Sequence, residues 1–323
     1  MNASPLVSLI LPAYNAERHI GAAIQSILSQ SFAEFELIII DDGSTDDTVG
    51  VTSRFNDQRI RVLGNDGNRG IVFSLNRGIE EARGCYMARM DADDIARPER
   101  LMRQFTFMED HPAVGLCGSW AQKFIAYGPR WTQRAQTSSA ELKASLLFAT
   151  PFVHPTVMIR RSVMDAHDLR YRDEFPAVED YRLWCEMALV TELAVIPEVL
   201  LDYRVSLSSV TGAVYLDGKR LNDRREILLK LWSDYIEKTL GFTPNRERLD
   251  AHACFYDLRF ARVSPDKVGA AHRWLDFLQQ ANGERKFFDG AALATVCNDV
   301  GRSLDVFSPA DVARRILISL LGK

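Results

Sequence analysis

Met87-Ala-Arg-Met-Asp-Ala-Asp-Asp94 is a half-apolar run that ends with three acids in four positions. Like charges this close repel one another, and a carboxylate removed from water without a partner resists ionisation. In an extended chain alternate side chains face the same way, so Asp91 and Asp93 project to one side and Asp94 to the other. Two carboxylates on one side suit Mg²⁺ or Mn²⁺, which complete their coordination with water and phosphate oxygens. The run therefore favours a divalent cation that bridges a diphosphate to the protein.

Two other interpretations of these acids compete with a Mg²⁺ or Mn²⁺ site. A solvated acidic turn, capping a helix that begins near Pro98, is the commoner explanation for such a motif taken alone. A calcium-binding EF-hand loop is excluded, because Ala96 stands where that loop needs glycine and Ile95 where it needs an oxygen ligand. The choice between a cation site and a solvated turn therefore depends on the surrounding pattern.

The first 110 residues alternate between strand-like and helix-like patterns. Short apolar runs predict buried strands, at 6–11, 35–40, 60–63 and 85–90. Apolar residues at helical spacing follow the first and third runs, beginning at Ile20 and Ile71, and Asn15 is expected to cap the first helix. This alternation predicts parallel βαβ units with right-handed crossovers, in which ligands bind beyond the carboxyl ends of the strands.

Polar and acidic residues directly follow three of these strands. The strand ends that carry these polar and acidic residues are Pro12–Asn15, Asp41–Asp42 and Asp91–Asp94. A random scatter of polar groups would not be expected to select strand ends three times, and the carboxyl ends of parallel strands share one edge of the sheet. The sequence therefore predicts one ligand site, to which three strands contribute.

The rest of the chain changes character twice. Between about 111 and 205 the pattern is mixed, with strands expected at 114–120, 156–159 and 199–205 and a helix at 179–189. After the polar segment 206–212, helical periodicity is expected at 219–239, 246–261, 266–281, 287–301 and 309–321. The fold class predicted from the residues is α/β with an appended C-terminal helical extension.

Composition narrows the class of protein and of partner. The 47% hydrophobic and 25% charged residues are typical of a globular protein, and a formal net charge of -4 gives no reason to expect nucleic acid as a partner. Five scattered cysteines without a CxxC pair indicate reduced thiols in a cytoplasm. No run approaches the roughly 18 apolar residues that span a bilayer. We expect a cytoplasmic protein.

The segment 309–323 carries an apolar helical face beside Arg314 and Arg315. Such a helix could rest on an anionic membrane, where lipid-linked acceptors reside, which would place the protein peripherally at the inner face of the membrane. Docking of the helix against the chain's own helices is the alternative explanation.

Together with two further motifs, the residues at the three strand ends resemble those of the family 2 nucleotide-sugar glycosyltransferases. The resemblance spans roughly residues 5 to 205 and rests on five motifs, 7–15 (VSLILPAYN), 38–46 (IIIDDGSTD), 68–70 (NRG), 90–94 (MDADD) and 178–184 (VEDYRLW). It implies the GT-A fold, a Rossmann-like and mostly parallel sheet sandwiched by helices. It also implies a donor-binding half at 1–110 and an acceptor half at 111–210, followed by the helical extension at 211–323.

The resemblance also implies roles for individual residues. Asp93 would bind the Mn²⁺ or Mg²⁺ ion, and Asp41 would accept a hydrogen bond from the base. The donor-binding set would comprise Pro12, Ala13, Tyr14, Asn15, Glu17, Asp41, Asp42, Arg69, Gly70, Asp91 and Ala92. Tyr14 offers a π-face for stacking, although ordinary packing also explains it, and Asp41 with Asp42 could simply cap the next helix. Asp94 and His154 are weaker candidates.

The resemblance assigns the general base to Asp180, with Glu179 beside it. An acceptor alcohol must lose its proton as it attacks the sugar, and a carboxylate within hydrogen-bond reach can take that proton. Attack from the face opposite the leaving group inverts the anomeric centre. The alternative is that two acids at a helix start merely interact with the helix dipole.

The function predicted is that of a metal-dependent inverting glycosyltransferase with a nucleotide-sugar donor. UDP is the expected carrier, with GDP and dTDP as alternatives. A glycan or lipid-linked glycan of the cell surface is the expected acceptor. A sugar-nucleotide pyrophosphorylase would need a glycine-rich basic loop where Pro12–Asn15 stands, and a non-catalytic sugar or metal-binding module would need no base. A processive synthase of the same family would carry Q-x-x-R-W, but Ala270 precedes Arg273-Trp274.

Overall fold

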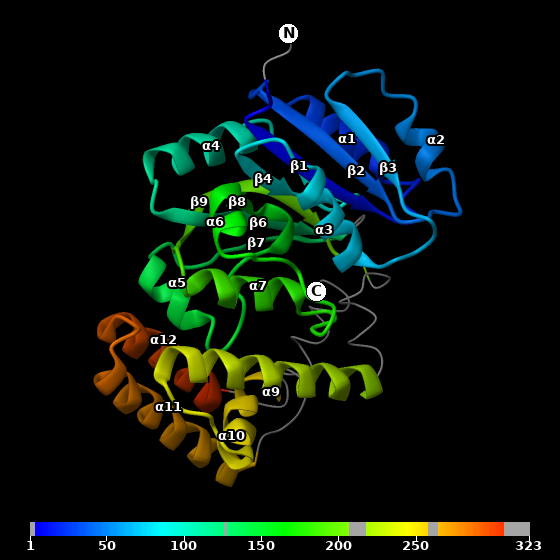
Figure 1. Ribbon diagram of the computed structural model, residues 1–323. Helices are drawn as coiled ribbons and strands as arrows, with labels where there is room; N and C mark the ends of the chain where they lie inside the picture. The colour runs from blue at the N-terminus through cyan, green and yellow to red at the C-terminus, as the bar shows by residue number, and fades with distance from the viewer. Residues whose placement is uncertain (1–3, 126–127, 207–217, 258–263, 307–323) are drawn as a thin grey trace.

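The computed structural model describes residues 4–125, 128–206, 218–257 and 264–306. Nine strands form one sheet in the order β3-β2-β1-β4-β8-β6-β9-β5, and β7 pairs with β6. Helices cover the sheet, and a group of C-terminal helices packs beneath it (Figure 1). The predicted α/β fold with a helical extension is confirmed.

The N-terminal half of the sheet is parallel, as predicted. Its strands are β1 (Val7–Ala13), β2 (Phe35–Asp41), β3 (Ile60–Gly64) and β4 (Tyr86–Arg89). The connecting helices are α1 (Ile20–Leu28), α2 (Thr48–Thr52) and α3 (Ile71–Glu81). Leu9 and Leu11 of β1 pack in one hydrophobic cluster, while Ile10 between them packs in the other. The strands read as continuous apolar runs because both faces of the sheet are buried.

The second half of the sheet mixes parallel and antiparallel pairs. Its strands are β5 (Ile95–Ala96), β6 (Val114–Phe124), β7 (Arg130–Gln133), β8 (Met158–Arg160) and β9 (Glu192–Arg204). The helical segments are α4 (Arg100–Asp110), α5 (Ser139–Ser145), η1 (His154–Thr156), α6 (Arg161–Ala166) and α7 (Glu179–Ala188). Strand β8 pairs antiparallel with β4 on one side and β6 on the other, so it joins the two halves.

Three local expectations are wrong. Asn15 does not cap α1, which begins at Ile20; its Oδ1 instead accepts the Thr45 N–H at 2.8 Å. The strand expected at 156–159 begins at Met158, because Thr156 belongs to a 3₁₀ turn. The strand expected at 199–205 begins at Glu192, because the chain absorbs Pro197 in a register shift against β6 rather than ending there.

Four helices of the predicted extension are confirmed. They are α9 (Gly218–Leu240), α10 (Arg246–Asp257), α11 (Pro265–Arg285) and α12 (Gly290–Val306). In Figure 1, α9 lies alongside α7, and Trp232 of α9 donates a hydrogen bond to Tyr181 of α7. Among the residues that the structure describes, no helix combines the length and apolar character needed to cross a membrane. The membrane contact expected at 309–323 lies outside the described residues.

The division into a donor-binding half at 1–110, an acceptor half at 111–210 and a helical extension at 211–323 remains a prediction. Residue 110 is the last residue of α4, and residue 210 lies outside the described part of the chain.

Candidate functional site

The three strand ends that carry polar and acidic residues lie at one edge of the sheet. Ala13 pairs in register with Asp41, and the Asp42 N–H donates to the Ala13 carbonyl at 2.8 Å. On the other side of β1, Ile10 pairs with Arg89, two residues before Asp91. The polar residues after β1, β2 and β4 are therefore neighbours.

Asp91, Asp93 and Asp94 form the acidic cluster at the end of β4. Each offers a carboxylate oxygen, and these oxygens lie within 4.8 Å of one another. Burial, followed by repulsion from Asp91, raises the pKa of Asp93 to about 6. Carboxylates crowded and buried in this way are stabilised by a hard cation, so the residues fit Mg²⁺ or Mn²⁺.

Asp94 also holds the cluster in place. Its side chain is fully buried, and its Oδ1 accepts the Arg204 N–H of β9 at 2.8 Å. The Arg204 guanidinium in turn donates to the main-chain carbonyl of Asp93 at 3.0 Å, which leaves the Asp93 carboxylate free of that contact. The second oxygen of Asp94 is buried without a hydrogen-bond partner. One carboxylate oxygen therefore anchors the turn to β9, while the other is available to a ligand.

The loop after β1 is braced by the loop after β2. Glu17 Oε2 accepts the Asp47 N–H at 3.0 Å, as Asn15 accepts that of Thr45. Asn15 has a φ of 49° and therefore turns the chain sharply. Tyr14 is 48% exposed beside these contacts, whereas Ala13 is buried at the end of β1. Tyr14 has a face open for stacking, while Asn15 and Glu17 bind backbone.

Asp41 and Asp42 are both buried but differ in what they bind. Asp42 accepts the N–H groups of Arg69 and Gly70, at 2.9 and 2.8 Å, and so fixes the loop before α3. Asp41 Oδ2 accepts the Ser44 N–H at 3.3 Å, while its Oδ1 is buried without a partner. An unsatisfied buried oxygen at a strand end is suited to an N–H donor from a ligand. Asp41 fits that role better than Asp42.

Arg69 and Gly70 stand at the start of α3. Gly70 is the residue before the helix and has a φ of 87°, a conformation that favours glycine. The Arg69 guanidinium lies over the Phe73 ring, 4.2 Å from its centroid, and forms an exposed ion pair with Asp66. Both residues therefore border the loop that Asp42 fixes. Ala92 is buried in the core beside the acidic cluster.

Glu179 and Asp180 occupy the first turn of α7. Asp180 Oδ1 accepts the N–H of Tyr181 at 2.7 Å. Burial raises the pKa of Asp180, against the opposing effect of Arg89 and Arg224. Burial and the charge of Asp180 raise the pKa of Glu179 to about 7. These acids are less solvated than helix-capping acids usually are, which suits one of them to accept a proton near neutral pH.

His154 lies beside the same pair. Its Nδ1 is 3.9 Å from Asp180 Oδ2, and its Nε2 is 2.9 Å from the Tyr171 hydroxyl. Burial lowers the pKa of His154 well below its usual value, so the ring is neutral. When the Tyr171 O–H donates to Nε2, the ring proton is on Nδ1 and faces Asp180. His154 therefore belongs to the surroundings of Asp180.

Arg89 is a site residue that the sequence reasoning missed. Its side chain is only 8% exposed, and its guanidinium pairs with both oxygens of Asp91. The same cation lowers the pKa of Asp93 and Asp94 on one side and of Glu179 and Asp180 on the other. Arg89 therefore acts electrostatically on both the acidic cluster and the Glu179–Asp180 pair. A signal was present in the opening run, where Arg89 is a charged residue inside a buried strand.

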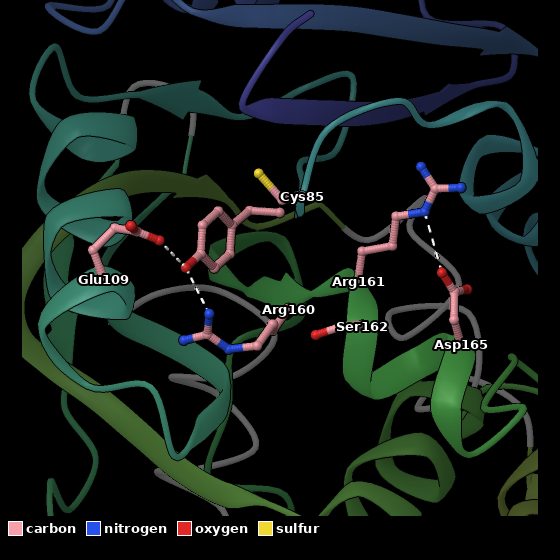
Figure 2. A pocket seen from close by; sticks show the side chains of 7 residues that line it. Cys85, Glu109, Arg160, Arg161, Ser162 and Asp165 are labelled. Atoms are coloured by element: carbon pink, nitrogen blue, oxygen red, sulfur yellow. Dashed lines mark hydrogen bonds and ion pairs between the residues drawn. The ribbon is translucent and has the colours of Figure 1, made fainter.

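A separate cavity of about 330 Å³ lies at the opposite end of β4 (Figure 2). Its lining includes Tyr86, whose hydroxyl donates to Glu109 and accepts from Arg160. Arg161 and Asp165, also in the lining, form an ion pair. The cavity is lined by groups that pair with one another, and it is distinct from the site at the end of β4.

The comparisons with known proteins agree on one family. The description "Glycosyl transferase family 2" matches residues 8–167. An uncharacterized glycosyltransferase of Haemophilus influenzae is 34% identical over 228 residues, covering 67% of this chain and 70% of that protein. The glucosyltransferase WfgD of Escherichia coli, which uses UDP-Glc and α-D-GlcNAc-diphosphoundecaprenol, is 29% identical and covers 73% of this chain and 88% of its own length.

Solved structures share the fold. TarS of S. aureus in complex with UDP-GlcNAc has a TM-score of 0.63 at 17% identity, over 93% of this chain and 90% of TarS. The mannosyltransferase PcManGT of Pyrobaculum calidifontis, in complex with GDP-Man and Mn²⁺, has a TM-score of 0.55 at 16% identity, over 100% of this chain and 89% of that one.

Proposed function

Because the chain belongs to glycosyltransferase family 2, we propose that it is an inverting, metal-dependent enzyme that transfers a sugar from a nucleotide sugar to a hydroxyl group. UDP is the proposed carrier, since WfgD uses UDP-Glc and TarS binds UDP-GlcNAc. The observation that carries the proposal is the buried charge of Arg89. It pairs with Asp91 and acts electrostatically both on the acidic cluster, which we propose binds the cation, and on the pair of raised-pKa acids.

The donor is held where the three strand ends meet. The unpaired oxygen of Asp41 accepts an N–H from the base, Tyr14 stacks on the base, and Asp91 lies nearest the ribose. Asp93, with the free oxygen of Asp94, would hold the divalent ion. When bound, that ion neutralises charge on the diphosphate.

Asp180 is the proposed general base. It takes the proton of the acceptor hydroxyl as that oxygen forms a bond to the anomeric carbon, and the bond from this carbon to the diphosphate breaks. The electron pair of the broken bond leaves with the nucleoside diphosphate. Attack from the opposite face inverts the configuration. Because His154 is neutral, it forms no ion pair with Asp180 that would hold the proposed base in its charged form.

The proposed acceptor is a growing glycan linked to a lipid diphosphate. The support is WfgD, whose acceptor is a diphosphoundecaprenol-linked GlcNAc, and an amylovoran biosynthesis glycosyltransferase of Erwinia amylovora that is 28% identical over 73% of this chain. The reaction would add one sugar to a cell-surface polysaccharide precursor at the inner face of the membrane.

A donor panel tests this function. The full-length chain is incubated with UDP-, GDP- and dTDP-sugars, with and without Mn²⁺, and with GlcNAc-diphosphoundecaprenol as acceptor. We expect sugar transfer from a UDP-sugar only with Mn²⁺, and a product whose anomeric configuration by NMR is opposite to that of the donor. Retained configuration, or transfer that is equally fast in EDTA, would contradict the mechanism. Nucleoside triphosphate formed from pyrophosphate would instead indicate a pyrophosphorylase, and binding without turnover a non-catalytic module.

A further inference from the structure

The C-terminal extension touches α7 through a buried chain of hydrogen bonds. Trp232 Nε1–H of α9 donates to the Tyr181 hydroxyl at 3.0 Å, and that hydroxyl donates to the Leu146 carbonyl at 2.7 Å. Trp232 and Tyr181 are 1% and 4% exposed, so water does not substitute for either partner. A buried tyrosine hydroxyl with both a donor and an acceptor has a fixed direction.

Tyr181 directly follows Asp180 and binds it. The Tyr181 N–H donates to Asp180 Oδ1 at 2.7 Å, so the backbone that Tyr181 fixes also orients the carboxylate. Trp232 is itself fixed by the extension, because its ring packs against His252 of α10, with centroids 4.8 Å apart. The path from the core of the extension to Asp180 therefore contains no exposed side chain before the carboxylate.

One ion pair and one electrostatic interaction also link α9 to α7. Asp234 forms an ion pair with Arg182 of α7 at 3.4 Å. Arg224, eight residues before Trp232, acts electrostatically on both Glu179 and Asp180, and its Nε is buried without a hydrogen-bond partner.

We infer that α9 is a positioning element of the transfer site, with Trp232 holding Tyr181 and thereby the carboxylate of Asp180 in the direction that proton transfer needs. This inference rests on the proposed function, because it assumes that Asp180 is the base. It assigns to the extension a task in catalysis in addition to its contribution to the core. Misplacement of a reacting group by about 1 Å is enough to slow a reaction by roughly 100-fold, so such a task has a measurable effect.

Trp232→Phe tests the inference, with Tyr235→Phe as its matched control. Tyr235 lies on the same helix, is equally buried, and donates to the Lys143 carbonyl of α5 at 3.1 Å rather than to α7. Each variant loses one buried hydrogen bond between the extension and the rest of the chain. Thermal denaturation establishes that both are folded and similarly stable before any comparison is made.

With UDP-glucose, Mn²⁺ and GlcNAc-diphosphoundecaprenol, we expect Trp232→Phe to lower kcat at least about tenfold. The KM for UDP-glucose should not change, because the donor site belongs to β1, β2 and β4. Tyr235→Phe should change neither. The double variant Trp232→Phe/Tyr181→Phe should be no slower than Tyr181→Phe alone, since both remove the same chain of contacts. Equal kcat in Trp232→Phe and Tyr235→Phe would overturn the inference.

Hydrogen exchange of peptides that cover α7 gives a second readout, which needs no substrate. We expect faster exchange at 179–184 in Trp232→Phe than in Tyr235→Phe at matched stability. Equal exchange in the two variants would also overturn the inference. A wild-type chain that transfers no sugar would contradict the proposed function, whereas the contact between α9 and α7 is judged by exchange alone.

Discussion

At the scale of single residues, the site depends on carboxylates that are kept partly out of water. Asp93, Asp94, Glu179 and Asp180 all have raised pKa values because burial disfavours their charged forms. Arg89 offsets this effect on both sides, and its own charge is retained because Asp91 pairs with it. One buried cation therefore favours the charged forms of both groups of acids.

Replacing Asp180 tests its assignment as the base. Asp180→Asn keeps the shape and loses the proton acceptor, so we expect sugar transfer to fall roughly 100- to 10,000-fold while UDP affinity by calorimetry stays unchanged. Asp165→Asn, at an exposed position near the other end of β4, is the control and should be fully active. Near-normal turnover of Asp180→Asn would exclude Asp180 as the base.

The ionisation of Asp180 should also determine how the activity of the wild type depends on pH. A base works only when it is ionised, and burial raises the pKa of Asp180 above the usual aspartate value. As pH falls from neutral, kcat/KM should therefore decline at a higher pH than an exposed aspartate would produce. A rate profile at constant ionic strength, with donor binding measured at each pH, separates this decline from loss of the donor. A flat profile down to pH 4 would argue against a buried base.

The proposed role of Asp93 in metal binding is tested by measuring Mn²⁺-dependent UDP affinity. Asp93→Asn removes one carboxylate charge from the cluster, so we expect Mn²⁺-dependent binding of UDP to weaken roughly 10- to 100-fold. Binding of UDP in EDTA should be the same in the variant and the wild type. Asp165→Asn, which removes an equally negative but exposed side chain near the other end of β4, serves as the control. Unchanged Mn²⁺ dependence in Asp93→Asn would place the ion elsewhere.

From the residues alone, site positions could be predicted only where a strand ends; Asp180 was assigned from the family resemblance. Asp41 and Asp93 follow apolar runs, so their place at one edge of the sheet could be read from the sequence. Tyr171 and Arg224 come from segments without a motif, and they reach Asp180 only because distant parts of the chain pack together. Such contacts arise from tertiary structure, which local periodicity does not contain.

At the scale of elements, the shape of the donor site depends on the loops that follow the strands. The turn after β2 depends on Gly43, which has a φ of 73°. A Cβ added there would lie 2.5 Å from the carbonyl carbon of Gly67, in the loop before α3. The two loops around the donor site therefore touch backbone to backbone, which requires the absence of a side chain at Gly43.

Gly43→Ala should lower the free energy of unfolding by about 2–3 kcal/mol, since it adds both strain and a clash. Gly64→Ala is the matched control, because a Cβ at Gly64 would meet no atom within 4 Å. The control should change stability by no more than about 0.5 kcal/mol. Urea denaturation measures both, and equal values would show that the two loops can separate without loss.

The elements that sequence patterns missed or misplaced are short or interrupted. β5 has two residues, too few for a period of two to be recognised, and β8 has three, so its expected bounds of 156–159 were inaccurate. β9 continues through Pro197 because the pairing with β6 shifts register there, and a proline inside an apolar run normally ends a strand. The long runs of β1 and β2 were predicted correctly because burial on both faces makes them apolar throughout.

At the scale of the whole molecule, the extension and the sheet domain share a buried histidine. His252 of α10 accepts the Trp274 indole N–H at 2.9 Å, and its Nε2–H donates to the Leu147 carbonyl at 2.7 Å. Burial lowers the pKa of His252 to about 4. The neutral ring is therefore part of the contact between the extension and the rest of the chain.

Acid should weaken this contact. The unfolded chain binds a proton at His252 below about pH 6.5, whereas the folded chain does so only below about pH 4. The stability that His252 contributes is complete above pH 6.5 and declines as pH falls toward 4, by up to about 3 kcal/mol. His252→Gln retains a donor and an acceptor without titrating, so its unfolding free energy should decline less between pH 6.5 and 4. His167→Gln, at an exposed position, should follow the wild type.

The pairing of β4 with β8 has a consequence for dividing the protein. A fragment that ends at residue 110 would retain β4 but lose Met158–Arg160, the strand that covers its outer edge. The exposed backbone groups of β4 would then be open to pairing with another copy, so such a fragment should aggregate rather than bind a nucleotide as a monomer. Chimeras between relatives should therefore be joined beyond β9, so that one parent supplies the complete set of strands.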